Sequence, residues 1–148
     1  MPVEDLAQII SPQNADEQIK KMFDFYEIDF EDYEEIEVNG NKASIVFEAA
    51  KKKLIKAIRK GKIEIDYDDN GELVIAQHLK CKYKTLTEIQ YKAVSGKAKV
   101  AMAKFDNQNS QIYALLAAMA GIEVSQIHAL KGPDLSIAEC LGGLFLLA

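Results

Sequence analysis

The stretch DYDDNG, residues 66–71, has the residue types of a calcium-binding loop. Asp66, Asp68 and Asn70 stand at the first, third and fifth positions of an EF-hand, and Gly71 stands at the sixth. The match ends at the twelfth position, where Gln77 replaces the bidentate Glu, and the preceding residues alternate like a strand instead of a helix. An Asn-Gly pair between two apolar runs is typical of a β-hairpin, so the sequence predicts a turn and no calcium site.

Four other side chains have the chemistry to bind zinc or to act in nucleophilic catalysis: His78, Cys81, His128 and Cys140. Only His78 and Cys81 are close in sequence, and there is no C-x-x-C pair, whereas zinc sites use closely spaced pairs of ligands. We therefore predict ordinary, partly buried His and Cys residues and no metal or cofactor. Two cysteines cannot form a disulfide framework, so free thiols and a cytoplasmic location are expected.

Two features of the sequence are weak indications of phosphate binding. The pair Gly96-Lys97 lacks the rest of a G-x-x-x-x-G-K-[ST] loop, and a helix that starts after Ser95 explains it without a ligand. Residues 51–62 are rich in Lys and Arg and could neutralise nucleic-acid phosphates. No aromatic residues are interleaved with them and the whole chain has a net charge of -5, which disfavours nucleic acid as a partner.

The charge is unevenly distributed along the chain. Residues 1–40 contain twelve Asp or Glu and two Lys, and residues 41–62 contain eight Lys or Arg and one Glu. Seven of the carboxylates form one run: Glu27, Asp29, Glu31, Asp32, Glu34, Glu35 and Glu37. Catalytic carboxylate pairs need different environments that separate their pKa values, and a continuous run does not provide them. The run predicts a solvated acidic face, and the sequence as a whole predicts no enzyme.

The elements that position these residues follow from capping and periodicity. Ser11 and Pro12 open a predicted helix, Gly61 ends a second helix that starts near residue 41, and residues 63–77 predict the hairpin. Residues 86–93 fit a third strand or a helix equally well, and residues from 95 onward predict helices. This pattern predicts an α+β fold, a mostly helical single domain with a small antiparallel β-hairpin sheet. Residues 1–40 are expected to form an acidic N-terminal helical arm and residues 41–148 the main domain (helix, hairpin, C-terminal helices), with one undivided domain as the alternative.

The C-terminal stretch GPDLSIAECLGGLFLLA, residues 132–148, is almost entirely apolar. Residues 135–148 are too few for a bilayer span, which needs about 20 apolar residues, so no membrane is expected as a partner. Ser136 and Glu139 fit a capping box of a last helix, in which Gly142-Gly143 either allows a close helix contact or lets the end detach. We predict that a partner or another copy contacts this end, and the residues concerned are Leu141, Leu144, Phe145, Leu146 and Leu147. Tyr113 and Met119 are expected behind them, as core.

The C-terminal half also carries a sequence of motifs that resembles a known family. They are L-T-E-I at residues 86–89, an Ala/Leu-rich helix at 112–120, Gly121-Ile122, Ile127 with Leu130, and Asp134 before an apolar helix at 135–146. Over residues 75–148 this order is similar to the small tail assembly chaperones of long-tailed bacteriophages and prophages. Residues 1–62 depart from the family, which has a shorter lead-in before the hairpin. The family has no catalytic residues to transfer.

The resemblance implies a protein-binding function in the host bacterial cytoplasm. Such chaperones hold the tape measure protein, which sets tail length, soluble until tail tube subunits assemble around it. The partners implied are the tape measure protein and the tail tube protein, together with other copies in a homo-oligomer. Two alternatives remain open from the residues: a virion structural or connector subunit that self-assembles, and a nucleic-acid-binding regulator that uses the basic residues 51–62.

Overall fold

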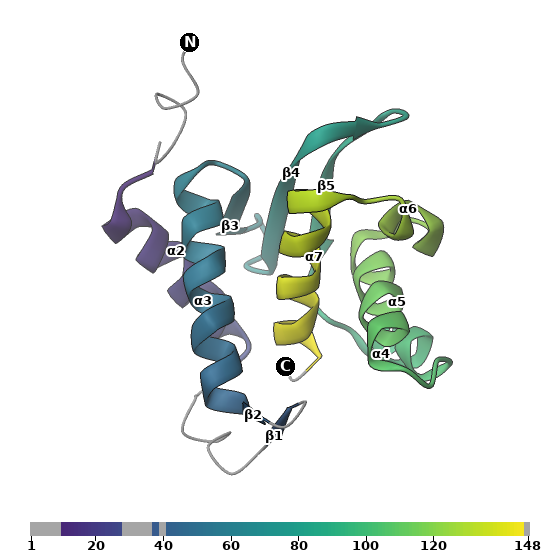
Figure 1. Cartoon of the computed structure of the whole chain (residues 1–148). Coiled ribbons are helices and arrows are strands. Elements are labelled where there is room, and N and C mark those ends of the chain that lie inside the picture. Colours follow the sequence, from purple (N-terminus) through teal and green to yellow (C-terminus); the bar gives the residue numbers. More distant parts are fainter. Residues whose placement is uncertain (1–9, 28–36, 39–40, 147–148) are drawn as a thin grey trace.

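A three-stranded antiparallel sheet and the last helix form the centre of this single α+β domain. The computed structural model describes residues 10–27, 37–38 and 41–146, with side chains from residue 48 onward in the last range. The elements are α2 (Pro12–Phe25), β1 (Glu37–Val38), β2 (Asn41–Lys42), α3 (Ala43–Arg59), β3 (Ile63–Tyr67), β4 (Leu73–Tyr83), β5 (Leu86–Lys92), α4 (Gly96–Ala103), α5 (Gln108–Ala120), α6 (Val124–His128) and α7 (Gly132–Phe145). Helix α7 lies between α3 and α5, with the sheet behind it (Figure 1).

The hairpin of β3 and β4 confirms the period-two pattern of the sequence. Its register runs from Ile63 opposite Gln77 to Tyr67 opposite Leu73. In the turn, Asp68 Oδ1 accepts the backbone N–H groups of Asn70 and Glu72, both at 2.9 Å. The Asp-rich stretch therefore stabilises its own turn, as side chains of this type do.

Strand β5 settles the choice that residues 86–93 left open. It pairs antiparallel with β4, giving the sheet order β3-β4-β5. Ile89 and Tyr91 are buried while Glu88 and Gln90 point to the opposite, more exposed face, which is the alternation of a half-buried strand. The pairing with β4 shifts register between His78 and Tyr83, so the strand is bulged beyond the regular sheet.

Helix α2 belongs to the same core as the rest of the domain. Ser11 caps it and Pro12 opens it, as predicted, and Ala15, Ile19 and Met22 are buried in the main cluster. The described part of the predicted N-terminal arm therefore shares the core of the main domain. The arm's residues 1–9, 28–36 and 39–40 lie outside the described residues.

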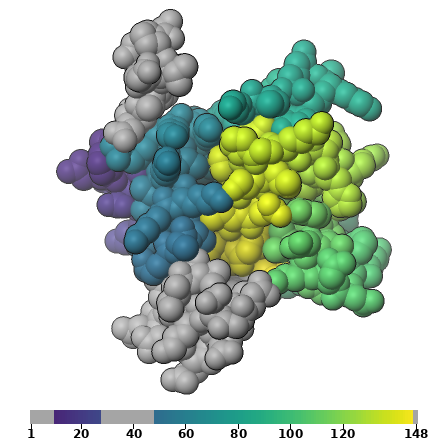
Figure 2. Space-filling model, in the orientation of Figure 1, coloured from purple at the N-terminus to yellow at the C-terminus, as the bar shows by residue number. Residues whose placement is uncertain are grey.

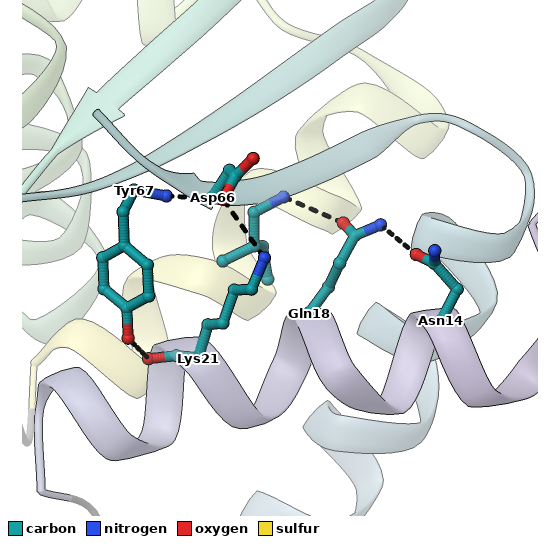
Figure 3. A network of polar contacts seen from close by, with 6 residues as sticks. Asn14, Gln18, Lys21, Asp66 and Tyr67 are labelled. Atoms are coloured by element: carbon teal, nitrogen blue, oxygen red, sulfur yellow. Dashed lines mark hydrogen bonds and ion pairs between the residues drawn. The ribbon is translucent and has the colours of Figure 1, made fainter. Parts of the chain in front are cut away.

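Helix α2 also covers the outer edge of β3, the strand at one side of the sheet (Figure 3). Gln18 Oε1 accepts the backbone N–H of Ile65 at 2.9 Å, and the Tyr67 hydroxyl donates to the backbone oxygen of Lys21 at 3.3 Å. Lys21 Nζ lies 3.1 Å from Asp66 Oδ1. An open strand edge exposes unpaired backbone groups to other chains, so this helix both satisfies and shields the edge.

Helix α7 starts one turn earlier than the predicted capping box implies. Its first residue is Gly132, Pro133 follows in the first turn, and Lys131 is the N-cap without a side-chain hydrogen bond. Ser136 therefore lies inside the helix, and the predicted capping box of Ser136 with Glu139 is wrong. Glu139 instead accepts the Tyr113 hydroxyl of α5 at 2.9 Å. The start of the helix is fixed by a tertiary contact of Asp134, described below.

Gly142 brings α7 close to α5. A Cβ atom at this position would collide with Ile112, whereas one at Gly143 would meet nothing within 4 Å. Of the two possibilities that the sequence offered for the glycine pair, the close helix contact applies to Gly142. Among the described residues, no helix is long and apolar enough to cross a membrane.

Candidate functional site

The residues predicted to contact a partner are mostly core. Leu141 is 0% exposed, and Leu144 and Phe145 are each 1% exposed. These three side chains pack inside the domain, so in this fold they present no accessible surface to a partner. The physical reason is that α7 is apolar on nearly all sides and is flanked by α3, α5 and the sheet, which cover it.

The other two residues predicted to contact a partner differ from these three. Leu146 is half-buried against the core, and Leu147 lies outside the described residues. Met119 is buried and Tyr113 is half-buried, as expected of core residues. The apolar chain end is therefore chiefly the domain's own central helix.

A buried polar cluster joins the first turn of α7 to the bulged part of β4. Asp134 is 1% exposed, and its two carboxylate oxygens accept the backbone N–H groups of Lys80 at 2.7 Å and Cys81 at 3.1 Å. The Tyr83 hydroxyl donates to the same carboxylate at 3.0 Å. The register shift in β4 leaves these amides without strand partners, and Asp134 satisfies them.

The cluster extends into the sheet through Gln77, which is fully buried. The Gln77 side-chain amide donates to the backbone oxygen of Asp134 at 2.8 Å, and its oxygen accepts the Tyr91 hydroxyl at 2.8 Å. Burial raises the pKa of Tyr91 well above its usual range, so its hydroxyl stays a donor. Among the described residues, no buried side-chain polar atom lacks a partner. The cluster therefore joins α7 to the sheet through hydrogen bonds within the domain.

His78 joins the three strands on the exposed side of the sheet. Its Nε2 lies 3.3 Å from Glu64 of β3, and its Nδ1 lies 3.1 Å from Glu88 of β5. The two carboxylates face different ring nitrogens, so the three side chains do not converge on one point where a metal ion would sit. The three side chains form a polar contact that spans the sheet.

The other residues with metal or thiol chemistry are dispersed. Cys81 is exposed, Cys140 donates to the backbone oxygen of Ala50 at 3.4 Å, and the His128 ring packs edge-on against Tyr113. Burial raises the pKa of the Cys140 thiol to about 11, which makes it a poor nucleophile. In the described ranges no group of three or more His, Cys, Asp or Glu is arranged to hold a metal.

A cavity with a mainly apolar lining lies between the tip of the β4–β5 hairpin and α6. It measures about 450 Å³, and its lining includes Tyr83, Lys84, Leu86, Ser125 and Lys131. Its lining contains no carboxylate, His or Cys.

Among the described residues, two of the three large hydrophobic side chains that are exposed lie in α4 or just after it. The large hydrophobic residues exposed among the described ones are Tyr67, Val100 and Phe105, with exposed fractions of 41%, 64% and 40%. Val100 lies in α4 and Phe105 directly follows it. No clear signal in the sequence predicted this surface, because the pattern of the short helix is like that of the other apolar segments of the C-terminal half.

A basic groove lies where the end of α3 meets the beginning of α7. It measures about 170 Å³ and is lined by Lys53, Lys56, Ala57, Lys60, Lys62, Pro133, Ser136 and Ile137. Helices α3 and α7 are neighbours on the face shown in Figure 2. The structure thus brings part of the basic run of residues 51–62 together on one groove.

In comparisons with known proteins, no family model, no curated protein and no solved structure matches this chain.

Proposed function

We propose that this chain is a non-enzymatic tail assembly chaperone that binds the tape measure protein of a bacteriophage or prophage. It keeps that protein soluble in the bacterial cytoplasm until tail assembly, with the tail tube protein as a second partner. The proposal rests on the motif order of residues 75–148 and on the fact that each motif coincides with a distinct element of the fold.

That coincidence is the observation that carries the proposal. The L-T-E-I motif begins β5, the Ala/Leu-rich run is α5, and Gly121 ends α5 in a left-handed conformation with φ 66°. Ile127 and Leu130 are buried around α6, and Asp134 anchors the start of α7. A motif set in which each position has a structural role supports a shared fold, and in this family the fold serves binding.

The surface that suits this function is the exposed part of α4. A chaperone for an apolar, helical client needs accessible apolar side chains that do not belong to its own core. Val100 and Phe105 meet that requirement, whereas Leu141, Leu144 and Phe145 do not. We therefore place the client contact at α4 and the residues around it.

Co-expression with a tape measure protein from the same genome tests the proposal. The tape measure protein is expected in the soluble fraction with the wild-type chain and in the pellet without it. The double variant V100D/F105D should lose this effect, and T87D/Q90E, on exposed positions of β5, is the control that should keep it. If tape measure solubility is the same with and without the chain, the proposal fails.

A virion structural or connector subunit remains the second candidate, because an exposed apolar helix also suits self-assembly. Measuring the mass of the assembly that the purified chain forms distinguishes the two candidate functions. A closed ring or a tube would favour the structural subunit, and a small or mixed oligomer favours the chaperone.

A further inference from the structure

The two edges of the three-stranded sheet differ in what covers them. At the β3 edge, Gln18 of α2 accepts the backbone N–H of Ile65 at 2.9 Å. At the β5 edge, no described residue exchanges a hydrogen bond with the backbone groups that point away from β4. The strand has neither a proline nor a bulge between Glu88 and Lys92. An edge of this kind can pair with another extended chain.

The hydrogen bonds of the sheet determine which groups of β5 point outward. Because the Ile65 N–H points away from β4, Ile65 and Ile75 face each other without exchanging hydrogen bonds. Ile75 therefore directs its backbone groups to Tyr91 of β5, and Ile89 is bonded to β4 in the same way. The backbone groups that point away from β4 belong to the alternate residues of the strand: Glu88, Gln90 and Lys92.

The side chains of β5 are divided between the two faces of the sheet. Ile89 and Tyr91 are buried, whereas Gln90 and Lys92 are exposed on the opposite face. Glu88 lies on that exposed face too, so one acid and one base stand on either side of Gln90. This order of charges is complementary to itself when the strand is read in the opposite direction.

We propose that β5 pairs antiparallel with β5 of a second copy of the chain, which joins two sheets into one. The two-fold axis passes through Gln90, which lies opposite Gln90 of the second copy. Glu88 of each copy then lies opposite Lys92 of the other. All three outward residues meet outward residues, and about six backbone hydrogen bonds form between the copies.

The charges select this register from those that bring outward residues together. Registers that place Glu88 opposite Glu88, or Lys92 opposite Lys92, bring like charges together across the strands, which is destabilising. Registers between these place a charged residue opposite Gln90 and form no complete set of charge pairs. The contact uses the same surface of both copies, so it is isologous and closes at a dimer. One strand pair is smaller than the interface of a permanent dimer, so the association should be weak and concentration-dependent.

Exchanging the charges across the edge tests the inference. Glu88→Lys brings two positive charges together and Lys92→Glu two negative ones, so each variant should dimerise at least about tenfold more weakly than wild type. The double variant E88K/K92E reverses both charges and should dimerise like wild type. An equimolar mixture of the two single variants should form a heterodimer, because every charge again faces its opposite. Sedimentation velocity at up to about 500 µM protein measures the association.

Two matched controls separate strand pairing from the other contacts of these side chains. Glu88 lies 3.1 Å from one ring nitrogen of His78, and Glu64 of β3 lies 3.3 Å from the other. Glu64→Lys therefore makes the same charge change beside the same ring, away from the β5 edge, and should leave the association unchanged. Lys52→Glu, at an exposed position of α3, is the control for Lys92→Glu. Circular dichroism and thermal unfolding verify that each variant is folded.

The outward backbone groups are tested by hydrogen exchange. The amides of Glu88, Gln90 and Lys92 should exchange quickly in dilute wild-type protein and slowly at concentrations where the dimer forms. The amides of Ile89 and Tyr91, which are bonded to β4, should exchange slowly at both. Gln90→Pro removes an outward N–H, which an edge strand tolerates, and should abolish the dimer.

Several results would overturn the inference. They are a wild type that stays monomeric to about 500 µM, a mixture that forms no heterodimer, and a loss in Glu64→Lys equal to that in Glu88→Lys. Outward amides that are slow even in dilute protein would mean that another segment of the same chain covers the edge. If the edge variants still dimerise and V100D/F105D does not, the copies meet at α4. Protection that appears only with the tape measure protein would assign the edge to that client.

The inference does not rest on the proposed function. The tape measure experiment uses the α4 surface, and its control T87D/Q90E should keep the client soluble. The same control should weaken the dimer, because Gln90→Glu brings like charges together at the two-fold axis. Either idea can therefore fail without the other.

Discussion

The carboxylate of Asp134 accepts the backbone N–H of Lys80, 54 residues earlier in the chain, at 2.7 Å. This bond and the one from Cys81 make the first turn of α7 the partner of a strand irregularity in β4. The helix that fills the centre of the domain is thereby held in register with the sheet behind it (Figure 1). Asp134 is thus a buried charge whose hydrogen bonds join two elements.

Replacing Asp134 should be among the most destabilising single changes in this chain. Asp134→Ala removes the acceptor of the Lys80 and Cys81 amides and of the Tyr83 hydroxyl, so the free energy of unfolding should fall by about 1–3 kcal/mol. Asp134→Asn should lose less, because its amide oxygen still accepts one bond. Urea unfolding followed by circular dichroism measures both, and Asp69→Ala, at an exposed turn position, should stay within about 0.5 kcal/mol of wild type. An Asp134→Ala protein as stable as this control would contradict the structural role.

Replacing each glycine of the pair in α7 by alanine should have opposite effects on stability. Gly142→Ala places a methyl group against Ile112 and Leu116 of α5, and overpacking of this kind costs about 1–3 kcal/mol. Gly143→Ala meets open space and should stabilise the protein by about 0.5–1 kcal/mol through helix propensity. Thermal unfolding of the two variants beside wild type gives the signs. Equal shifts in the same direction would mean that α5 and α7 do not approach closely at Gly142.

Local signals in the sequence predicted most of the elements. Ser11 with Pro12, Gly61 and Gly121 each mark a helix end that the structure has at the same place, because capping depends on neighbouring residues only. The hairpin around Gly71 follows from a two-residue period that helices cannot share. The strand β5 was ambiguous because its pairing with β4, and not its own pattern, decides its conformation.

The candidate site was less predictable because it depends on contacts between distant elements. The apolar pattern of residues 135–146 predicted a helix that is either buried in the core or associates with another chain. It did not reveal that α3 and α5 would cover Leu141 and Leu144. The Asp134 cluster depends on a bulge in β4 that no local pattern announces. A single acid at the start of an apolar helix was the only available signal. The grouping of the lysines with Pro133 likewise required the packing of α3 on α7.

The two cysteines should differ sharply in reactivity. Cys81 is exposed, whereas burial raises the pKa of Cys140 to about 11, so that at pH 8 roughly one Cys140 in a thousand is a thiolate. A chromogenic disulfide reagent at pH 8 should therefore modify one thiol per native chain quickly and two in denaturant. Cys81→Ser should remove the fast reaction. Comparable rates for both thiols in the folded protein would contradict the burial of Cys140.

The same burial predicts a loss of stability at alkaline pH. The pKa of Cys140 is raised on folding from an unfolded value of about 8.5, and that of Tyr91 is raised as well. For such groups the neutral form is favoured in the folded state. The contribution of Cys140 is fully present below about pH 8.5 and is lost as pH rises toward 11, whereas the loss from Tyr91 begins only near its unfolded pKa of about 10. Melting temperatures between pH 8 and 11 should fall, and Cys140→Ala should fall less steeply than Cys81→Ala. Identical slopes for the two variants would exclude Cys140 as a source of the pH dependence.

The stability of the contact between α2 and the edge of β3 should depend more on Gln18 than on the neighbouring ion pair of Lys21 and Asp66 (Figure 3). Gln18→Ala removes the acceptor of the Ile65 N–H and should lower the free energy of unfolding by about 1–2 kcal/mol. Lys21→Ala should cost about 0.5 kcal/mol or less, because its pair with Asp66 is exposed and screened by solvent. Glu17→Ala, on the exposed side of α2, is the neutral control. Hydrogen exchange of the Ile65 amide should accelerate in Gln18→Ala alone, because that amide then faces water or another chain's strand edge. If exchange is unchanged while stability falls, the loss comes from helix packing and the edge is satisfied by another group.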